Sequence, residues 1–357
     1  MCVASNLYQA ILDEACRNLS KEIEWIDRYR GYLDKIHICQ GAPLFKQKTK
    51  GMEGLGNLSL YLPVSTIKQA NAKSAYLDLR YCGISVAELK IQARGMQISI
   101  NHQHSALFDG YANLPWPSGQ QPKGYISWDD EDAKLFRAFF ENSPGRAGGA
   151  GTKHQYTEQN FESQLLGQFA MRTSTGKLLP WIQPVCMLGY RFQMPTPFMA
   201  SGIKNAMKGS QFDASAVEYS GPDGGGIDIL ARQGRGKGVC LTVIELKDEC
   251  TRQEPPEVAI AQAIVYASFM HALLREPQAG LEDYTWWEFF GFSRPIPDKL
   301  KLRAVIAMPF GQDNSQDLAK VSLTFPYSQD TLDLHYLYFN CDGVTKTITG
   351  PIETSLP

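Results

Sequence analysis

Apolar residues recur at helical spacing at the start of the chain and change to alternation further along. Between residues 5 and 34 they lie three or four positions apart, which predicts one or two amphipathic helices. From residue 76 to residue 101 apolar and polar positions alternate, which predicts three short antiparallel strands. Ser127 and Asp130 then resemble the start signal of a further helix. The first part of the chain is therefore expected to be an α+β domain with a small antiparallel sheet.

The second half combines helical spacing with short runs of branched apolar residues. Residues 227–231 and 239–247 are two such runs, and the segment RQGRGKG between them has three glycines and no apolar residue, which predicts a strand hairpin. The other predicted elements are two helices over 156–172 and 255–274, a strand over 301–310 and a terminal hairpin over 334–349.

The clearest break in the pattern is the string PGRAGGAGTK at residues 144–153, which is small, flexible and free of large apolar side chains. It predicts two domains, 1–145 and 146–357. The string resembles a phosphate-binding loop, but that motif requires Gly-Lys followed by Ser or Thr, and here Thr152 precedes Lys153. This order excludes a nucleotide triphosphatase of that class.

Composition is typical of a globular protein. Hydrophobic residues make up 43% and charged residues 20% of the 357 residues, and no apolar run approaches the length that spans a bilayer. The N-terminus carries acids where a signal peptide would be apolar, so a cytoplasmic location without membrane contact is expected. Eight cysteines occur without a C-x-x-C pair, which gives no support to a zinc knuckle.

Three charged residues on the predicted hairpin carry the candidate chemistry. Asp228 lies on the first run, and Glu245-Leu246-Lys247 lies on the second. Side chains of a strand alternate between faces, so Glu245 and Lys247 are expected to point the same way. One alternative is that they form a surface ion pair on an edge strand, while Asp228 lies in a glycine-rich turn. The branched apolar residues around Glu245 favour a buried strand instead, where a charge needs a partner or a task.

Two carboxylates suit a divalent cation. Mg²⁺ prefers oxygen ligands and usually takes one or two protein carboxylates, which Asp228 and Glu245 supply. Such a metal activates water and offsets the charge of a scissile phosphate, and an ammonium group beside it can orient the nucleophile or stabilise developing negative charge. Lys247 fits that role.

The pattern Asp228 followed by Glu245-x-Lys247 resembles the core motif of the PD-(D/E)XK nuclease superfamily, over the chain from about residue 154 onward. The resemblance implies a restriction-endonuclease-like α/β domain with a mixed central sheet flanked by helices. It also implies Mg²⁺ or Mn²⁺ and hydrolysis of nucleic-acid phosphodiesters. The chain departs from the pattern in one respect, because Ile227 and not proline precedes Asp228. A literal Pro222-Asp223 lies upstream, which leaves Asp223 as the alternative acid.

Two further parts of the superfamily pattern have counterparts here. A helical glutamate before the hairpin corresponds to Glu162, with Glu158 as the alternative one turn earlier, and it would be a further metal ligand. Gln262 and Tyr266, four apart on the next predicted helix, resemble the Gln-x-x-x-Tyr element of RecB-like and exonuclease-type branches. The alternative is that Gln262 faces solvent and Tyr266 belongs to the core.

These observations predict a metal-dependent deoxyribonuclease, with the N-terminal domain selecting the substrate or a partner. The net charge of −2 gives no support to tight non-specific nucleic-acid binding. Two alternatives stay open: a nuclease-like fold that binds nucleic acid or protein without cutting, and a hydrolase of small nucleotides. The aromatic segment 284–297 is expected in the core or at an interface, and the sequence leaves a homodimer or a protein partner open.

Overall fold

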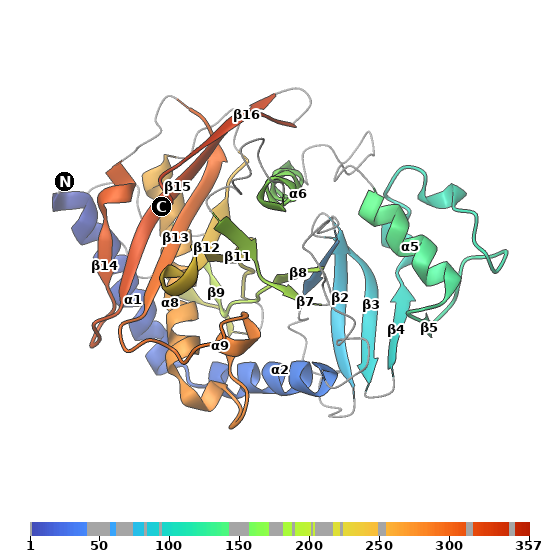
Figure 1. The fold of residues 1–357 in the computed structure, drawn as a ribbon, viewed down its shortest axis with the longest axis horizontal. Coiled ribbons are helices and arrows are strands. Elements are labelled where there is room, and N and C mark those ends of the chain that lie inside the picture. Colours follow the sequence, from blue (N-terminus) through green and yellow to red (C-terminus); the bar gives the residue numbers. More distant parts are fainter. Residues whose placement is uncertain are drawn as a thin grey trace. The chain divides into compact units, whose positions relative to one another are not determined.

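The computed structural model describes residues 2–40, 58–61, 74–81, 84–92, 95–142, 157–170, 181–187, 190–200, 203, 217–221, 224–248, 255–311, 317–342 and 347–357. The chain divides into two compact units, which Figure 1 shows with their elements labelled. Unit 1 comprises residues 1–33, 171–185 and 194–357, and unit 2 comprises residues 34–170 and 186–193.

Unit 1 contains a mixed sheet in the order β14-β15-β13-β12-β11-β6, with β16 paired to the long strand β15. Strands β12, β13 and β15 run parallel to one another, and the other pairings are antiparallel. The strands are β6 (Ile182–Pro184), β11 (Ile229–Gln233), β12 (Cys240–Leu246), β13 (Lys301–Pro309), β14 (Ser322–Thr324), β15 (Thr331–Asp342) and β16 (Thr347–Thr354). A separate two-stranded sheet pairs β9 (Phe198–Met199) with β10 (Glu218–Tyr219).

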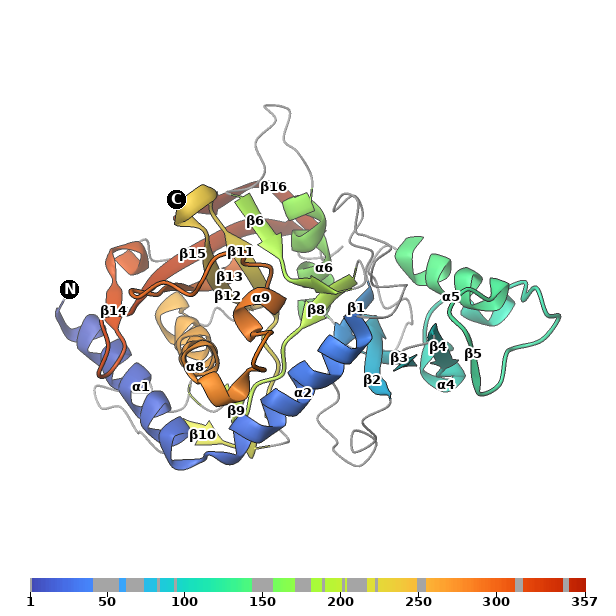
Figure 2. The same cartoon turned by 60° about the horizontal axis from the view of Figure 1, so that its bottom comes forward.

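Helix α8 (Pro256–Arg275) packs against β12 and β13, and α1 (Cys2–Lys21) packs against α8 (Figure 2). The N-terminal helix is tied to this unit by Tyr8, whose hydroxyl donates a hydrogen bond to the carbonyl oxygen of Glu257 at 3.1 Å. The short helix α9 (Trp286–Phe289) lies in the aromatic segment, and its residues Trp286, Trp287 and Phe289 are buried. The prediction that aromatic residues of this segment belong to the core is confirmed for these three residues.

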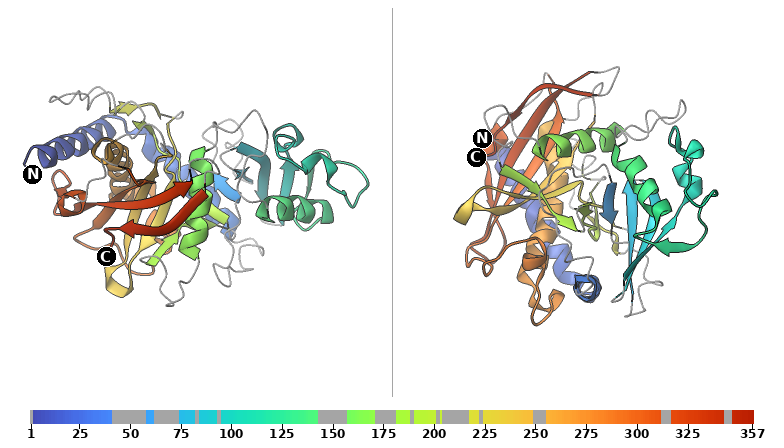
Figure 3. Two further views of the ribbon diagram at one scale, coloured as in Figure 1. Left: turned by 90° about the horizontal axis from the view of Figure 1, so that it is seen from above. Right: turned by 45° about the vertical axis from the view of Figure 1, so that its right-hand side comes forward.

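Unit 2 has a seven-stranded sheet in the order β5-β4-β3-β2-β1-β8-β7. Its strands are β1 (Leu58–Tyr61), β2 (Ala75–Tyr81), β3 (Ile84–Gln92), β4 (Gly95–Ile100), β5 (Tyr125–Ser127), β7 (Cys186–Met187) and β8 (Tyr190–Gln193). Its helices are α4 (His102–Ser105), α5 (Glu131–Asn142) and α6 (Thr157–Ala170). The teal-green helix α5 lies beside the cyan strands (Figure 3), and the ring centroids of Phe140 on α5 and Tyr81 on β2 are 4.9 Å apart. Helix α2 (Glu24–Gln40) contributes residues to both units.

The structure is a mixed α/β protein with a mixed multi-stranded sheet flanked by helices, as the sequence pattern predicts in outline. The predicted hairpins, the strands of the small sheet and the helices are present. The predicted domains 1–145 and 146–357 are consecutive, whereas each unit takes up separate pieces of the chain. The physical reason is that α1 packs on α8 near the other end of the sequence, and residues 190–193 pair in parallel with β1.

Helix α8 has the predicted length of 20 residues, but it is more apolar than the sequence analysis allowed. By length and composition it could cross a membrane, because its most apolar window has a mean hydropathy of 1.5. Most of that window, 72%, is buried inside the protein, which is the behaviour of a core helix. Its apolar character is accounted for by the sheet on one side and α1 on the other.

Candidate functional site

Asp228 and Glu245 lie at neighbouring ends of two antiparallel strands. The register of β11 and β12 pairs Ile229 with Ile244, so Asp228 and Glu245 occupy the next position along each strand. A hydrogen bond fixes the first acid, because the backbone N–H of Leu246 donates to Asp228 Oδ2 at 2.8 Å. The strand hairpin thus brings together the two acids that the sequence places seventeen residues apart.

Lys247 completes what we call the acid–lysine set, which consists of Asp228, Glu245 and Lys247. The Lys247 ammonium donates to Glu245 Oε1 at 2.7 Å, and the two side chains are 14% and 6% exposed. Strand β12 lies between β11 and β13, and all seven of its residues are buried. The alternative of a surface ion pair on an edge strand is therefore wrong, because the pair lies at the end of a buried central strand.

The environment of Glu245 disfavours its charged form. Burial raises the pKa of its carboxyl group well above the usual range, the neighbouring Asp228 raises it further, and Lys247 opposes both. Its second oxygen, Oε2, is buried and has no hydrogen-bond partner among the residues that the structure describes. A buried carboxylate oxygen without a donor is costly, and a cation is one group that would satisfy it. The donor set therefore fits a hard divalent metal.

The glycines before Asp228 allow the backbone to approach its neighbours closely. The N–H of Gly225 donates to the carbonyl oxygen of Phe198 at 2.7 Å, and a Cβ on Gly224 would lie 1.9 Å from the carbonyl oxygen of Thr196. A Cβ on Gly225 would lie 2.7 Å from the hydroxyl of Tyr266. A larger residue at Gly224 would require a shift of the backbone, and one at Gly225 would require a shift of the Tyr266 side chain and would crowd the carbonyl oxygen of Phe198. The alternative acid Asp223 lies outside the described residues.

Helix α8 presents Tyr266 to this same segment. The Tyr266 side chain is buried, and its pKa is raised first by burial and then by the charges of Glu245 and Asp228, so the phenol lies within the field of both acids. Gln262 precedes it by four residues and shares its helix face. Gln262 is 8% exposed, so the solvent-facing alternative is wrong. Its role at the site stays a prediction.

The two candidate third acids belong to unit 2, on α6. Glu162 is buried there and forms an ion pair with the buried Arg191 of β8. This pair gives Glu162 a structural role within its own unit, where it joins α6 to the sheet. The prediction that Glu162, or its alternative Glu158, is a further metal ligand therefore stays untested.

A second buried charge cluster in unit 1 was missed by the sequence analysis. We call it the Asp330 cluster: His271 Nε2 lies 2.8 Å from Asp330 Oδ2, Arg275 donates to both carboxylate oxygens at 2.7 and 2.8 Å, and the N–H of Leu300 donates to Oδ1 at 2.7 Å. Burial alone would raise the pKa of Asp330, but these hydrogen bonds outweigh it and hold that pKa below its usual value. The only local signal was the spacing of His271 and Arg275, four apart on one helix.

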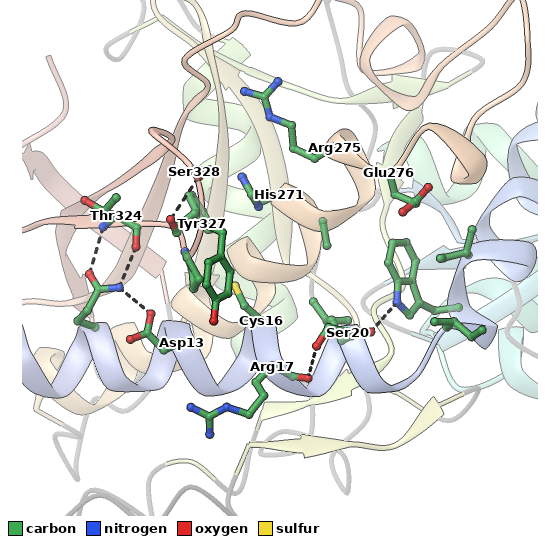
Figure 4. A pocket seen from close by; sticks show the side chains of 18 residues that line it. Asp13, Cys16, Arg17, Ser20, His271, Arg275, Glu276, Thr324, Tyr327 and Ser328 are labelled. Carbon is green, nitrogen blue, oxygen red and sulfur yellow. Dashed lines mark hydrogen bonds between the residues drawn. The ribbon is translucent and has the colours of Figure 1, made fainter.

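Next to the Asp330 cluster lies a cavity of about 930 Å³ between α1, the end of α8 and the turn before β15 (Figure 4). His271 stacks on Phe325 in its wall, with ring centroids 3.8 Å apart. Tyr327 projects fully into solvent from a backbone with φ of 58°. None of the acid–lysine set, Gln262 or Tyr266 lines this cavity, so its size alone does not connect it with the candidate chemistry.

Comparisons of the chain with family models, with curated proteins and with solved structures gave no match. The candidate site is therefore defined by its own geometry: two acids on adjacent strands, a lysine paired to one of them, and a tyrosine hydroxyl beside the segment that leads into the site.

Proposed function

We propose that the protein is a metal-dependent phosphodiesterase that hydrolyses DNA through a restriction-endonuclease-like site in unit 1. One observation carries the proposal: Glu245, at the end of a buried central strand, is paired with Lys247 at 2.7 Å, lies beside Asp228 and keeps one buried oxygen without a hydrogen-bond donor among the described residues. A purely structural ion pair does not require a second acid at that place.

Each residue has a distinct part in this proposal. Asp228 and Glu245 would hold Mg²⁺ or Mn²⁺, and the Leu246 N–H keeps the Asp228 carboxylate in place. The metal, when bound, supplies Lewis acidity toward water and phosphate. Lys247 offers a positive charge that orients the attacking water or stabilises charge developing on the phosphate oxygens. Glu245 holds the Lys247 ammonium in position, and Tyr266 with Gln262 shapes the wall formed by α8.

DNA is proposed as the substrate because the acid and acid-x-lysine pattern resembles that of nucleases acting on DNA. A cytoplasmic location is proposed because the N-terminus carries acids where a signal peptide would be apolar. The charge balance of the chain adds no support for tight non-specific binding, so substrate positioning is expected to depend on local contacts and to weaken with salt.

The test is cleavage of linear and circular DNA by the full chain in Mg²⁺ or Mn²⁺, with EDTA as the metal-free arm. Asp228→Asn and Lys247→Ala each remove one member of the acid–lysine set. The matched control is Lys134→Ala, because Lys134 also pairs with a glutamate, Glu131, at 2.6 Å but lies exposed on α5. Folding of every variant is checked by circular dichroism and thermal denaturation.

Cleavage that needs the metal, persists in Lys134→Ala and is lost in both site variants is the expected result. Full activity in folded Asp228→Asn would refute the assignment. Single-stranded RNA and a bis-nucleotide phosphodiester serve as parallel substrates, and exclusive cleavage of either would replace DNA in the proposal. Metal binding without cleavage of any substrate would instead favour a binding module.

A further inference from the structure

The sheet of unit 1 carries a second polar group of side chains on its other face. The register pairs Thr242 of β12 with Arg303 of β13, and Arg303 with Asp333 of β15. Residues paired in register share a face, and so does His335, two positions beyond Asp333. Glu245 is three positions from Thr242 and points to the opposite face. The acid–lysine set and these residues therefore lie on different sides of the sheet.

Thr242, Arg303 and His335, which we call the arginine cluster, contain buried polar atoms without hydrogen-bond partners among the residues that the structure describes. The atoms are Thr242 Oγ1, Arg303 Nε and Nη1, and His335 Nε2. The three residues are 0%, 8% and 7% exposed. Most buried polar atoms in proteins are satisfied, so several orphaned atoms on neighbouring strands indicate that a group belongs there.

The orphaned atoms are all donors or can act as donors. Burial first, and then the charge of Arg303, lower the pKa of His335 to about 4, so the ring is neutral at pH 7. Its Nδ1 lies 3.2 Å from Ser355 Oγ, which accepts the N–H of Tyr336 at 3.0 Å. In the tautomer that carries its proton on Nε2, the ring can donate a hydrogen bond from that atom. Arg303 has only donors, and the Thr242 hydroxyl can donate.

Asp333, the acid that the strand register pairs with Arg303, does not complete the cluster. Asp333 accepts a hydrogen bond from Lys301 Nζ at 2.8 Å through Oδ2 and one from Ser322 Oγ at 2.7 Å through Oδ1. Both carboxylate oxygens are thus directed to other partners. A buried guanidinium that lacks a closely bonded counter-charge is costly, and a carboxylate, phosphate or sulfate group is the usual complement of arginine.

We propose that the arginine cluster binds a small oxyanion, carboxylate or phosphate in type, on the sheet face opposite the acid–lysine set. The anion accepts hydrogen bonds from Arg303, Thr242 and His335 and neutralises the guanidinium. The segment after β16 lies beside the cluster, because Ser355 contacts His335 and Gln233 Nε2 donates to the carbonyl oxygen of Pro357 at 2.8 Å. Binding therefore also stabilises the attachment of this segment to the sheet.

The experiment measures thermal unfolding of the full chain in EDTA at pH 7, with sodium phosphate, sulfate or acetate titrated against chloride at matched ionic strength. At least one oxyanion is expected to raise Tm by a few degrees in a saturable way. Phosphate and sulfate also stabilise proteins without binding to a site. Thr242→Val, which keeps the shape and removes the hydroxyl, and Arg303→Gln separate the two effects, because both should lose the saturable component.

Lys134→Gln is the control, since it removes one positive charge from an exposed position on α5 and should keep the saturable shift. If Arg303→Gln does not fold, Thr242→Val and His335→Gln carry the test. The relative affinity for phosphate and acetate tells which oxyanion source the site prefers. Shifts of equal size in the parent and in all folded variants would mean an adventitious ion only, and no saturable shift in the parent would overturn the proposal in favour of buried water. Because the experiment contains no metal and no DNA, its outcome is independent of the proposed nuclease activity.

Discussion

The Asp330 cluster and the acid–lysine set are both built around buried carboxylates in unit 1, but they are satisfied to different degrees. Asp330 accepts hydrogen bonds on both oxygens from His271, Arg275 and Leu300. Glu245 is paired through one oxygen only, and its other oxygen has no donor among the described residues. The pKa of Asp330 is held below its usual value, and that of Glu245 is raised above it.

The difference distinguishes a cluster whose charges are matched within the protein from one whose carboxylate keeps an oxygen without a hydrogen-bond donor among the described residues. Asp330 joins α8 to the start of β13 and β15, and its negative charge is matched by Arg275. At Glu245 burial and the neighbouring Asp228 both disfavour the charged carboxylate, and Lys247 opposes them. A buried carboxylate whose charged form is disfavoured costs stability, and such groups are often found at functional sites.

The largest effect is expected from Glu245→Gln. The amide keeps the shape of the side chain and removes the charge that would hold the proposed cation, so the proposed metal-dependent DNA cleavage should fall by roughly 10²- to 10³-fold. The free energy of unfolding in EDTA should stay unchanged or rise, because the charge that burial and Asp228 disfavour is gone. Cleavage assays and urea titrations measure the two quantities. Loss of activity together with a large loss of stability would make Glu245 a structural residue instead.

The opposite result is expected from Asp330→Asn. It removes the charge that pairs with Arg275, whose side chain is 29% exposed, so the free energy of unfolding should fall by about 1.5–3 kcal/mol in the same urea titration. Cleavage per folded molecule should not change, because none of the acid–lysine set contacts this cluster among the described hydrogen bonds. If Asp330→Asn kept its stability but lost cleavage, the conclusion that the Asp330 cluster has a structural role and no catalytic one would be wrong.

The sequence predicted these two clusters unequally, for a physical reason. Asp228, Glu245 and Lys247 lie on consecutive strands of one hairpin, so strand alternation and a short turn suffice to bring them together. The Asp330 cluster joins residues about sixty positions apart through the packing of a helix against a sheet, which no local pattern encodes. Arg303 is a charged residue within the apolar run of β13, which the sequence shows. The residues that lie beside it are set by the register of β12, β13 and β15, which the sequence does not show.

The same reasoning applies to the division into units. Alternation within residues 76–101 predicted β2, β3 and β4, because each strand pairs with the next along the chain. The addition of β8 beside β1 is a parallel, long-range pairing, and a glycine-rich break near residue 145 could not reveal it. Likewise, the glycines before Asp228 predict a turn, whereas the structure shows that Gly224 and Gly225 lie in close contact with neighbouring residues.

The smallest effect on stability is expected from a variant that tests the contact between Gly225 and the Tyr266 hydroxyl. In Gly225→Ala the added methyl group would meet the Tyr266 hydroxyl at 2.7 Å and the carbonyl oxygen of Phe198 at 3.0 Å, so the free energy of unfolding should fall by about 1–3 kcal/mol. Tyr266→Phe removes the first obstacle. The double variant should therefore lose less stability than the sum of the single variants, by about 1 kcal/mol in a urea titration.

Gly31→Ala is the matched control for this cycle, because a methyl group there meets nothing within 4 Å. Gly31 lies within α2, so alanine should stabilise the protein by about 0.5–1 kcal/mol and should show no coupling to Tyr266→Phe. Additive effects of Gly225→Ala and Tyr266→Phe would mean that the Tyr266 hydroxyl does not press on this segment. The proposed place of Tyr266 beside the acid–lysine set would then lose the support of this contact.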